Sequence, residues 1–250
     1  MEAWEDEAVV LAARPHGEGH AIATVFTRTQ GVRRGLVYGG AGRRARANWQ
    51  PGTLLAARWR ARLADQLGRL EGEMVFAASA SVLEDPLALA VLASACAVAE
   101  AALPEAEPHP RAYEALVGLM GRLADREGGL AAYVRWEVVL LAELGFGLDL
   151  TACAVTGARE GLAFVSPRTG RAVSGAAAGP WRERLLPLPA FLIGEAPAAP
   201  EDIAAGLRLT GHFLARDVFG SAHRSPPPAR ERLGAAVAAL AAGSPRAEHA

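Results

Sequence analysis

The residues with the clearest chemical potential are arginines that cluster between positions 28 and 69. This segment holds ten arginines and one acidic residue, Asp65, so its formal charge is +9, and the remainder of the chain is −10 because the net charge is −1. Concentrated positive charge attracts the phosphate backbone of a nucleic acid. All 26 basic residues of the chain are arginine, so the inference rests on where the arginines cluster and not on the choice of arginine over lysine.

Two groups of arginines stand out within the segment. The stretch LLAARWRARL, residues 54–63, alternates as a strand does, so that Arg58, Arg60 and Arg62 form one charged row. The opposite, apolar side of this strand holds Leu55, Ala57, Trp59, Ala61 and Leu63. The loop GGAGRRARANWQPG, residues 39–52, adds Arg43, Arg44 and Arg46 on a segment expected to be mobile because it is rich in glycine.

Three aromatic residues lie among these arginines. Tyr38 and Trp49 are candidate stacking surfaces for bases, whereas strand alternation assigns Trp59 to the core. The candidate DNA-binding residues are therefore Arg33, Arg34, Arg43, Arg44, Arg46, Arg58, Arg60, Arg62, Tyr38 and Trp49.

The segment CAVTGAREGLAFVSPRTGRAVS, residues 153–174, begins like a metal-binding knuckle. Cys153 stands at the first ligand position, but Thr156 occupies the second, and RAVSGA supplies no cysteine further on. A tetrahedral structural zinc site needs four ligands. We therefore expect no metal and no cofactor.

The sequence contains little evidence of a catalytic motif. GGAGRR lacks the Lys-Ser/Thr ending of a phosphate-binding loop, and no dinucleotide fingerprint, G-x-S-x-G or H-E-x-x-H motif occurs. An enzyme whose site is assembled from distant residues stays open as an alternative.

The elements that must position these residues change character near position 80. Five short β-type segments, separated by turns rich in Gly, Pro, Asn and Asp, occupy residues 1–79 and suffice for a small barrel of the OB type. From Asp85-Pro86, a helix start, helical periodicity dominates residues 80–250, with Gly145 as the cap of a helix over 129–144. The predicted class is α+β multidomain.

Composition also bears on the compartment. Two cysteines, Cys96 and Cys153, favour a reducing interior, and the acidic first residues do not resemble an export signal. The most apolar run, residues 87–103, is short and contains Glu100, so we expect a buried helix and no membrane partner. A cytoplasmic, nucleoid-associated protein is the expectation.

The order of several motifs resembles the RecO family of bacterial recombination mediators. The N-terminal match is EAVVLAARPHGEGHAIATVFTRTQGVRRGLVYGGAGRRAR, and the middle matches are YVRWEVVLLAELGFGLDLTACAVTG and LAFVSPRTGRAVS. Near the C-terminus the matches are LRLTGHFLARDVF and PARERL. Each motif alone is weak, but their order and spacing together are specific.

This resemblance implies an N-terminal OB-fold domain at 1–79 and a helical domain at 80–250, without enzymatic activity. It implies binding to single- and double-stranded DNA, strand annealing, action with RecR, and loading of RecA onto DNA coated with single-strand DNA-binding protein, whose acidic C-terminal tail is a further partner. Some members carry a four-cysteine zinc site where only Cys153 matches here, so residues 153–174 are interpreted as a metal-free zinc-ribbon-like hairpin. An OB-fold RNA-binding protein stays open, because a basic face does not distinguish the two sugars.

Overall fold

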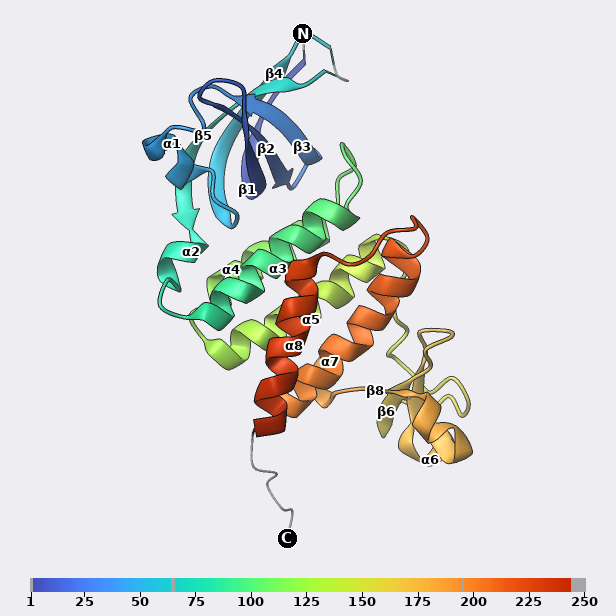
Figure 1. Ribbon diagram of the computed structural model, residues 1–250. Coiled ribbons are helices and arrows are strands. Elements are labelled where there is room, and N and C mark those ends of the chain that lie inside the picture. Colours follow the sequence, from blue (N-terminus) through green and yellow to red (C-terminus); the bar gives the residue numbers. More distant parts are fainter. Residues whose placement is uncertain (1, 64–65, 195, 244–250) are drawn as a thin grey trace. The chain divides into compact units, whose positions relative to one another are not determined.

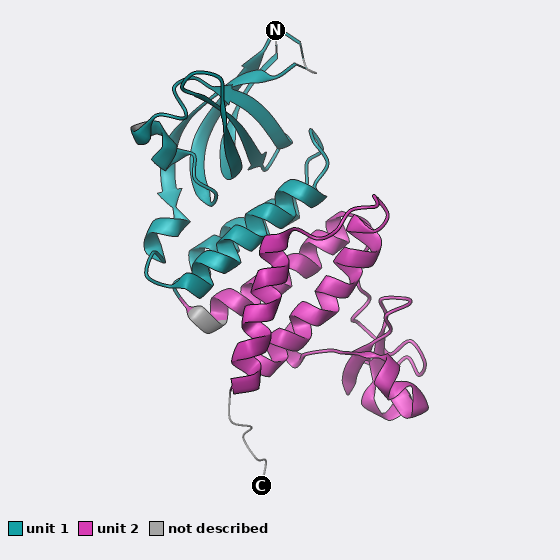
Figure 2. Ribbon diagram, in the orientation of Figure 1, with its two compact units in different colours: residues 1–124 teal, residues 125–250 magenta. Residues whose placement is uncertain are grey.

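A computed structural model describes residues 2–63, 66–194 and 196–243. The chain forms two compact units, Met1–Ala124 and Asp125–Ala250 (Figure 2). Across the described ranges, every helix is too short or too polar to cross a membrane.

Five strands of the first unit close into a barrel in the order β1-β2-β3-β5-β4 (Figure 1). Neighbouring strands are antiparallel except β3 and β5, which run parallel where Gly35 pairs with Gly68. The predicted count of five strands and their order along the chain are confirmed. The strands are β1 (Glu2–His16), β2 (His20–Thr27), β3 (Gly31–Val37), β4 (Thr53–Ala61) and β5 (Gly68–Ala77).

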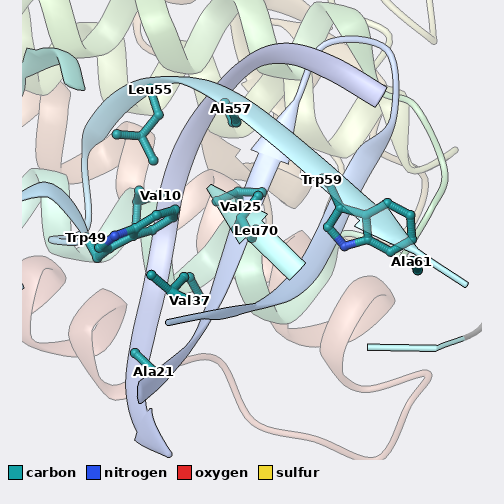
Figure 3. Close-up of a cluster of buried hydrophobic side chains, with 12 residues drawn as sticks. Val10, Ala21, Val25, Val37, Trp49, Leu55, Ala57, Trp59, Ala61 and Leu70 are labelled. Carbon is teal, nitrogen blue, oxygen red and sulfur yellow. The ribbon is translucent and has the colours of Figure 1, made fainter. Parts of the chain in front are cut away.

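Strand alternation builds the core of the barrel. In β4, Leu55, Ala57 and Trp59 are each at most 2% exposed and belong to one buried cluster (Figure 3). This confirms the predicted inward face. The prediction for Leu63 was wrong: β4 ends at Ala61, and beyond the last pairing Leu63 is 56% exposed.

Three helices complete the first unit: α2 (Ala78–Ser81), α3 (Pro86–Ala102) and α4 (Pro110–Arg122). The predicted start of α3 is confirmed, because the Asp85 carboxylate accepts hydrogen bonds from the backbone N–H groups of Leu87 and Ala88 at 2.9 and 3.1 Å. Cys96 is buried in α3.

The first unit extends beyond the strands because α3 and α4 pack on the barrel. Glu100 of α3 forms an ion pair with Arg14 of β1 at 2.6 Å, and the ring of Tyr113 in α4 meets Phe26 of β2 edge-on at 5.5 Å. The predicted boundary at 79/80 marks the change from strands to helices, whereas the compact unit continues to Ala124. The division into functional domains stays a prediction.

The second unit consists of helices and a small sheet. Its longer helices are α5 (Arg126–Glu143), α7 (Pro200–Phe213) and α8 (Pro228–Gly243), and α7 continues into the π-helix η3 (Leu214–Phe219). Gly145 follows α5 with a φ of +85°, which confirms its predicted capping position.

The small sheet of this unit has the order β7-β6-β8 and lies between α5 and α7 in the chain. Its elements are β6 (Leu162–Val165), β7 (Ala172–Ser174), α6 (Gly175–Ala178), the 3₁₀ turn η1 (Gly179–Arg184), β8 (Leu186–Pro187) and the 3₁₀ turn η2 (Ala190–Leu192). The hairpin predicted at 153–174 is present as β6 and β7.

Candidate nucleic-acid interface

The outer face of β4 presents the predicted arginines. Arg58 and Arg60 are exposed on either side of Trp59, whose indole N–H donates a hydrogen bond to the Arg34 carbonyl oxygen at 2.9 Å inside the barrel wall. Arg62 is exposed just beyond the strand. The side-chain directions inferred from alternation are confirmed for Arg58 and Arg60.

Acidic residues from other parts of the unit interrupt this positive row. Arg58 lies opposite Glu5 of β1 and Glu71 of β5, and its Nε is 3.0 Å from the Glu5 carboxylate. Glu71 in turn pairs with Arg60 at 3.5 Å and Arg69 at 2.6 Å. The expected continuous row is therefore broken, because pairing with β1 and β5 places glutamates between the arginines.

A hollow of about 370 Å³ marks the acidic end of the same face. Its lining includes Arg58 together with Glu5, Asp6, Glu7, Glu71 and Glu73. Five carboxylates around one guanidinium repel phosphate. Arg60, Arg62 and Arg69 lie near the opposite end of β4 and β5.

Arg33 and Arg34 of β3 also lie close to glutamates. Arg33 is half-buried, 3.7 Å from the Glu2 carboxylate and 5.5 Å from the centre of the Trp59 ring, while Arg34 pairs with Glu105 at 3.1 Å. Exposed ion pairs contribute only about 0–1 kcal/mol. Arg34 can exchange its partner for a phosphate at small cost, whereas Arg33 is the least accessible of the predicted residues.

The loop arginines differ from those on the strands. Residues Arg43–Asn48 form a six-residue helix, α1, where a mobile loop was predicted. Partly buried Ala45 and buried Trp49 attach this helix to the barrel core. Arg43 and Arg46 are exposed and form no ion pair within the described residues, and the side chain of Arg44 lies outside the described part.

The prediction of Trp49 as a stacking surface was wrong. Its side chain is 6% exposed and packs in the same cluster as Val10, Leu55 and Trp59 (Figure 3). A loop tryptophan fills the barrel end because α1 folds back over it. Only an edge remains accessible, in a hollow of about 470 Å³ that Arg46, Gln50 and Pro51 also line.

Tyr38 is an exposed aromatic residue at the end of β3. Its side chain is 57% exposed, the Arg69 guanidinium lies 5.0 Å from its ring centre, and His20 meets the ring edge-on at 5.0 Å. A cation over a ring face is favourable, and more than half of the Tyr38 side chain stays exposed. Arg69 was not among the predicted site residues, because only the parallel pairing of Leu36 with Arg69 reveals that it lies near Tyr38.

The knuckle at Cys153 is a hydrogen-bonded turn. Cys153 is 2% exposed, and its backbone carbonyl accepts the N–H of Gly157 at 2.8 Å, while its Sγ accepts the N–H of Ser174 at 3.3 Å. Hydrogen bonds from the Thr156 side chain and the Ser174 backbone lower the pKa of the Cys153 thiol to about 6.

Metal-binding groups do not converge elsewhere in the described ranges. Across residues 2–63, 66–194 and 196–243, no three His, Cys, Asp or Glu side chains lie together as they would around an ion.

Two family models match successive parts of the chain. The model described as "Recombination protein O N terminal" matches residues 1–77, and "Recombination protein O C terminal" matches residues 83–227. The chain belongs to the RecO family.

Curated members of the RecO family resemble the chain along nearly its whole length. The protein is 54% identical to the DNA repair protein RecO of Gluconacetobacter diazotrophicus over 247 residues, covering 96% of this chain and 97% of that one. It is 55% identical to the DNA repair protein RecO of Granulibacter bethesdensis over 240 residues, covering 95% and 96%. The resemblance expected from the sequence is confirmed, and it places this RecO-family chain among DNA repair and recombination proteins.

Proposed function

We propose that this RecO-family protein is a DNA-binding mediator of recombination that uses its barrel, taken as an OB fold, to hold single- and double-stranded DNA. The exposed, unpaired arginines of α1 carry the proposal, because Arg43 and Arg46 stand beside a core-anchored tryptophan without an acidic partner in the described part. Arg60, Arg62, Arg69 and Tyr38 add further positive charge and one exposed aromatic ring near the other end of β4.

The mode of contact follows from these groups. Guanidinium groups bind phosphates irrespective of base sequence, and an exposed tyrosine ring stacks on any base. Binding of this kind tolerates every sequence, which suits a protein that anneals complementary strands. It requires no catalytic group.

Protein partners form the second half of the proposal. In it, the protein acts with RecR, helps to load RecA onto DNA coated with single-strand DNA-binding protein, and binds that protein's acidic C-terminal tail.

The sequence offers five arginines for the tail, namely Arg122, Arg126, Arg135, Arg208 and Arg216, of which the side chain of Arg126 lies outside the described part. Arg135 donates to the Phe191 carbonyl oxygen at 2.9 Å and Arg216 pairs with Asp217, whereas Arg122 and Arg208 are exposed and form no ion pair with any described residue. Arg122 and Arg208 are therefore the better candidates. Such a function would place the protein on the nucleoid.

Anisotropy of a labelled single-stranded oligonucleotide tests the DNA-binding half. We expect binding at low salt, DNA competing at least as well as RNA of the same sequence, and faster annealing of complementary strands. Preference for RNA would favour the OB-fold RNA-binding alternative. RecA filament formation on coated DNA, with and without RecR, tests the mediator half, and no stimulation would contradict it.

A further inference from the structure

A second surface with cationic and aromatic side chains lies in the other compact unit, on the η1 turn between α6 and β8. Trp181 is 59% exposed, and the Arg184 guanidinium lies 5.5 Å from the centre of its ring. Arg182 extends over the ring of Phe164 in β6 at 5.4 Å. These four residues, Phe164, Trp181, Arg182 and Arg184, are called the η1 surface below.

The turn that carries the η1 surface is fixed on both sides. Before it, Gly175 donates its N–H to the Gly161 carbonyl oxygen at 2.9 Å, and Ala178 is 1% exposed. After it, β8 pairs with β6, and Leu188 donates to the Ala163 carbonyl oxygen at 2.9 Å. The backbone on either side therefore holds Trp181 outward, where its indole ring does not fill the core.

The charge around the turn is positive. Residues 153–188 contain five arginines and two glutamates, so the formal charge of this segment is +3. Arg171 pairs with Asp149 at 3.4 Å. The other four are exposed and have no ion-pair partner among the described residues: Arg159, Arg168, Arg182 and Arg184.

We propose that the η1 surface is a second contact site for single-stranded DNA, in which one base stacks on Trp181 while Arg182 and Arg184 hold neighbouring phosphates. Sites for single strands combine aromatic platforms with a positive groove, and guanidinium groups on aromatic rings strengthen such platforms. An acidic peptide shares the attraction to arginine, but an outward-facing indole offers a flat ring to stack on. The choice of DNA rests on the proposed function, whereas the site itself is separate from the barrel arginines.

Tryptophan fluorescence of the full chain tests the stacking directly. Trp181 is the most exposed of the described tryptophans, so oligo(dT) stacked on it should quench the emission of the wild-type protein. In Trp181→Phe this quenching should disappear while most of the affinity remains. Quenching that is equally large in Trp181→Phe would overturn the proposal. Quenching produced by an acidic peptide ending in phenylalanine, but not by oligo(dT), would also overturn it, in favour of a peptide site.

Affinity measurements form the second arm. Trp181→Ala should weaken oligo(dT) binding roughly fivefold or more, the low end for one stacked base. Arg182→Ala with Arg184→Ala should flatten the log–log salt slope by about 1.4. The matched control, Arg224→Ala with Arg232→Ala, removes two exposed arginines of the same unit, one before α8 and one in it, and should change neither quantity. Affinity within twofold of wild type in both test variants, with folding verified by circular dichroism, would refute the site.

Failure of this site and failure of the proposed function are distinguishable. A variant lacking the α1 arginines should bind oligo(dT) more weakly yet show full Trp181 quenching at saturation. Persistent quenching without any effect of the α1 arginines would retain the η1 surface and reject the barrel as the main site.

Discussion

Replacing Arg230 should destabilise the second unit strongly, because this arginine neutralises a buried carboxylate. Glu137 of α5 is 0% exposed, and its two oxygens accept hydrogen bonds from Arg230 of α8 at 2.5 and 3.0 Å. Tyr133 donates to the same carboxylate at 2.8 Å and Thr210 of α7 at 2.5 Å. One carboxylate thus connects three helices through charge-assisted hydrogen bonds.

The magnitude follows from what each change leaves behind. Arg230→Met removes the only positive charge that contacts Glu137 in the described part, and an uncompensated buried charge costs about 3–5 kcal/mol. Arg208→Met, at an exposed position of α7, is the matched control and should change stability by less than about 0.5 kcal/mol. Arg230→Met combined with Glu137→Leu should recover most of the loss, because the buried charge is then gone as well.

Urea denaturation followed by far-ultraviolet circular dichroism measures these differences. The reasoning predicts a lower midpoint for Arg230→Met with little change in slope, and a double mutant closer to wild type. A cost below about 1 kcal/mol for Arg230→Met would show that the carboxylate is protonated or hydrated and would refute the network as described.

Three further predictions follow from individual side chains. Because the Cys153 pKa falls from its ordinary value near 9 to about 6, the thiolate stabilises the fold above pH 9, and this contribution is lost as pH falls toward 6. The difference in unfolding free energy between wild type and Cys153→Ala should therefore shrink over this pH range. A pH-independent difference would contradict the turn geometry. Trp49→Ala should cost about 3–5 kcal/mol in chemical denaturation because Trp49 fills the core, while Trp49→Phe should keep DNA affinity; an unfolding cost near zero would contradict the buried position. Arg58→Ala should reduce DNA affinity less than Arg62→Ala, since Glu5 already pairs with Arg58, and the reverse order in anisotropy titrations would reject that ranking.

Local patterns were sufficient to predict the barrel strands. Alternation around Trp59 gave the correct inward face because each side chain of a paired strand must point to one of two sides. The helix start at Asp85 was equally local, since its carboxylate caps the following backbone. The same rule failed at Leu63, where strand pairing ends at Ala61 and alternation no longer has a physical basis.

The candidate site was less predictable because its chemistry depends on pairings between distant segments. Glu5 and Glu71 reach Arg58 and Arg60 only through the register of β1 and β5, so the +9 segment overstates the charge that a ligand meets. Trp49 looked accessible as a loop residue, and only the folding of α1 over the barrel end buries it. Tyr38 meets Arg69 through a parallel pairing that sequence separation conceals.

The salt dependence of single-stranded DNA affinity tests the central claim most directly. Arg43→Ala, Arg44→Ala and Arg46→Ala are combined in one variant, in which alanine preserves the helical propensity of α1. Each phosphate contact to a single strand contributes about 0.7 to the log–log slope, so the slope should flatten by roughly 2, with affinity falling alike for every sequence. The variant Arg224→Ala with Arg232→Ala controls for charge removal alone. A folded triple variant whose slope equals that of wild type would contradict the assignment of α1 as the DNA-binding element.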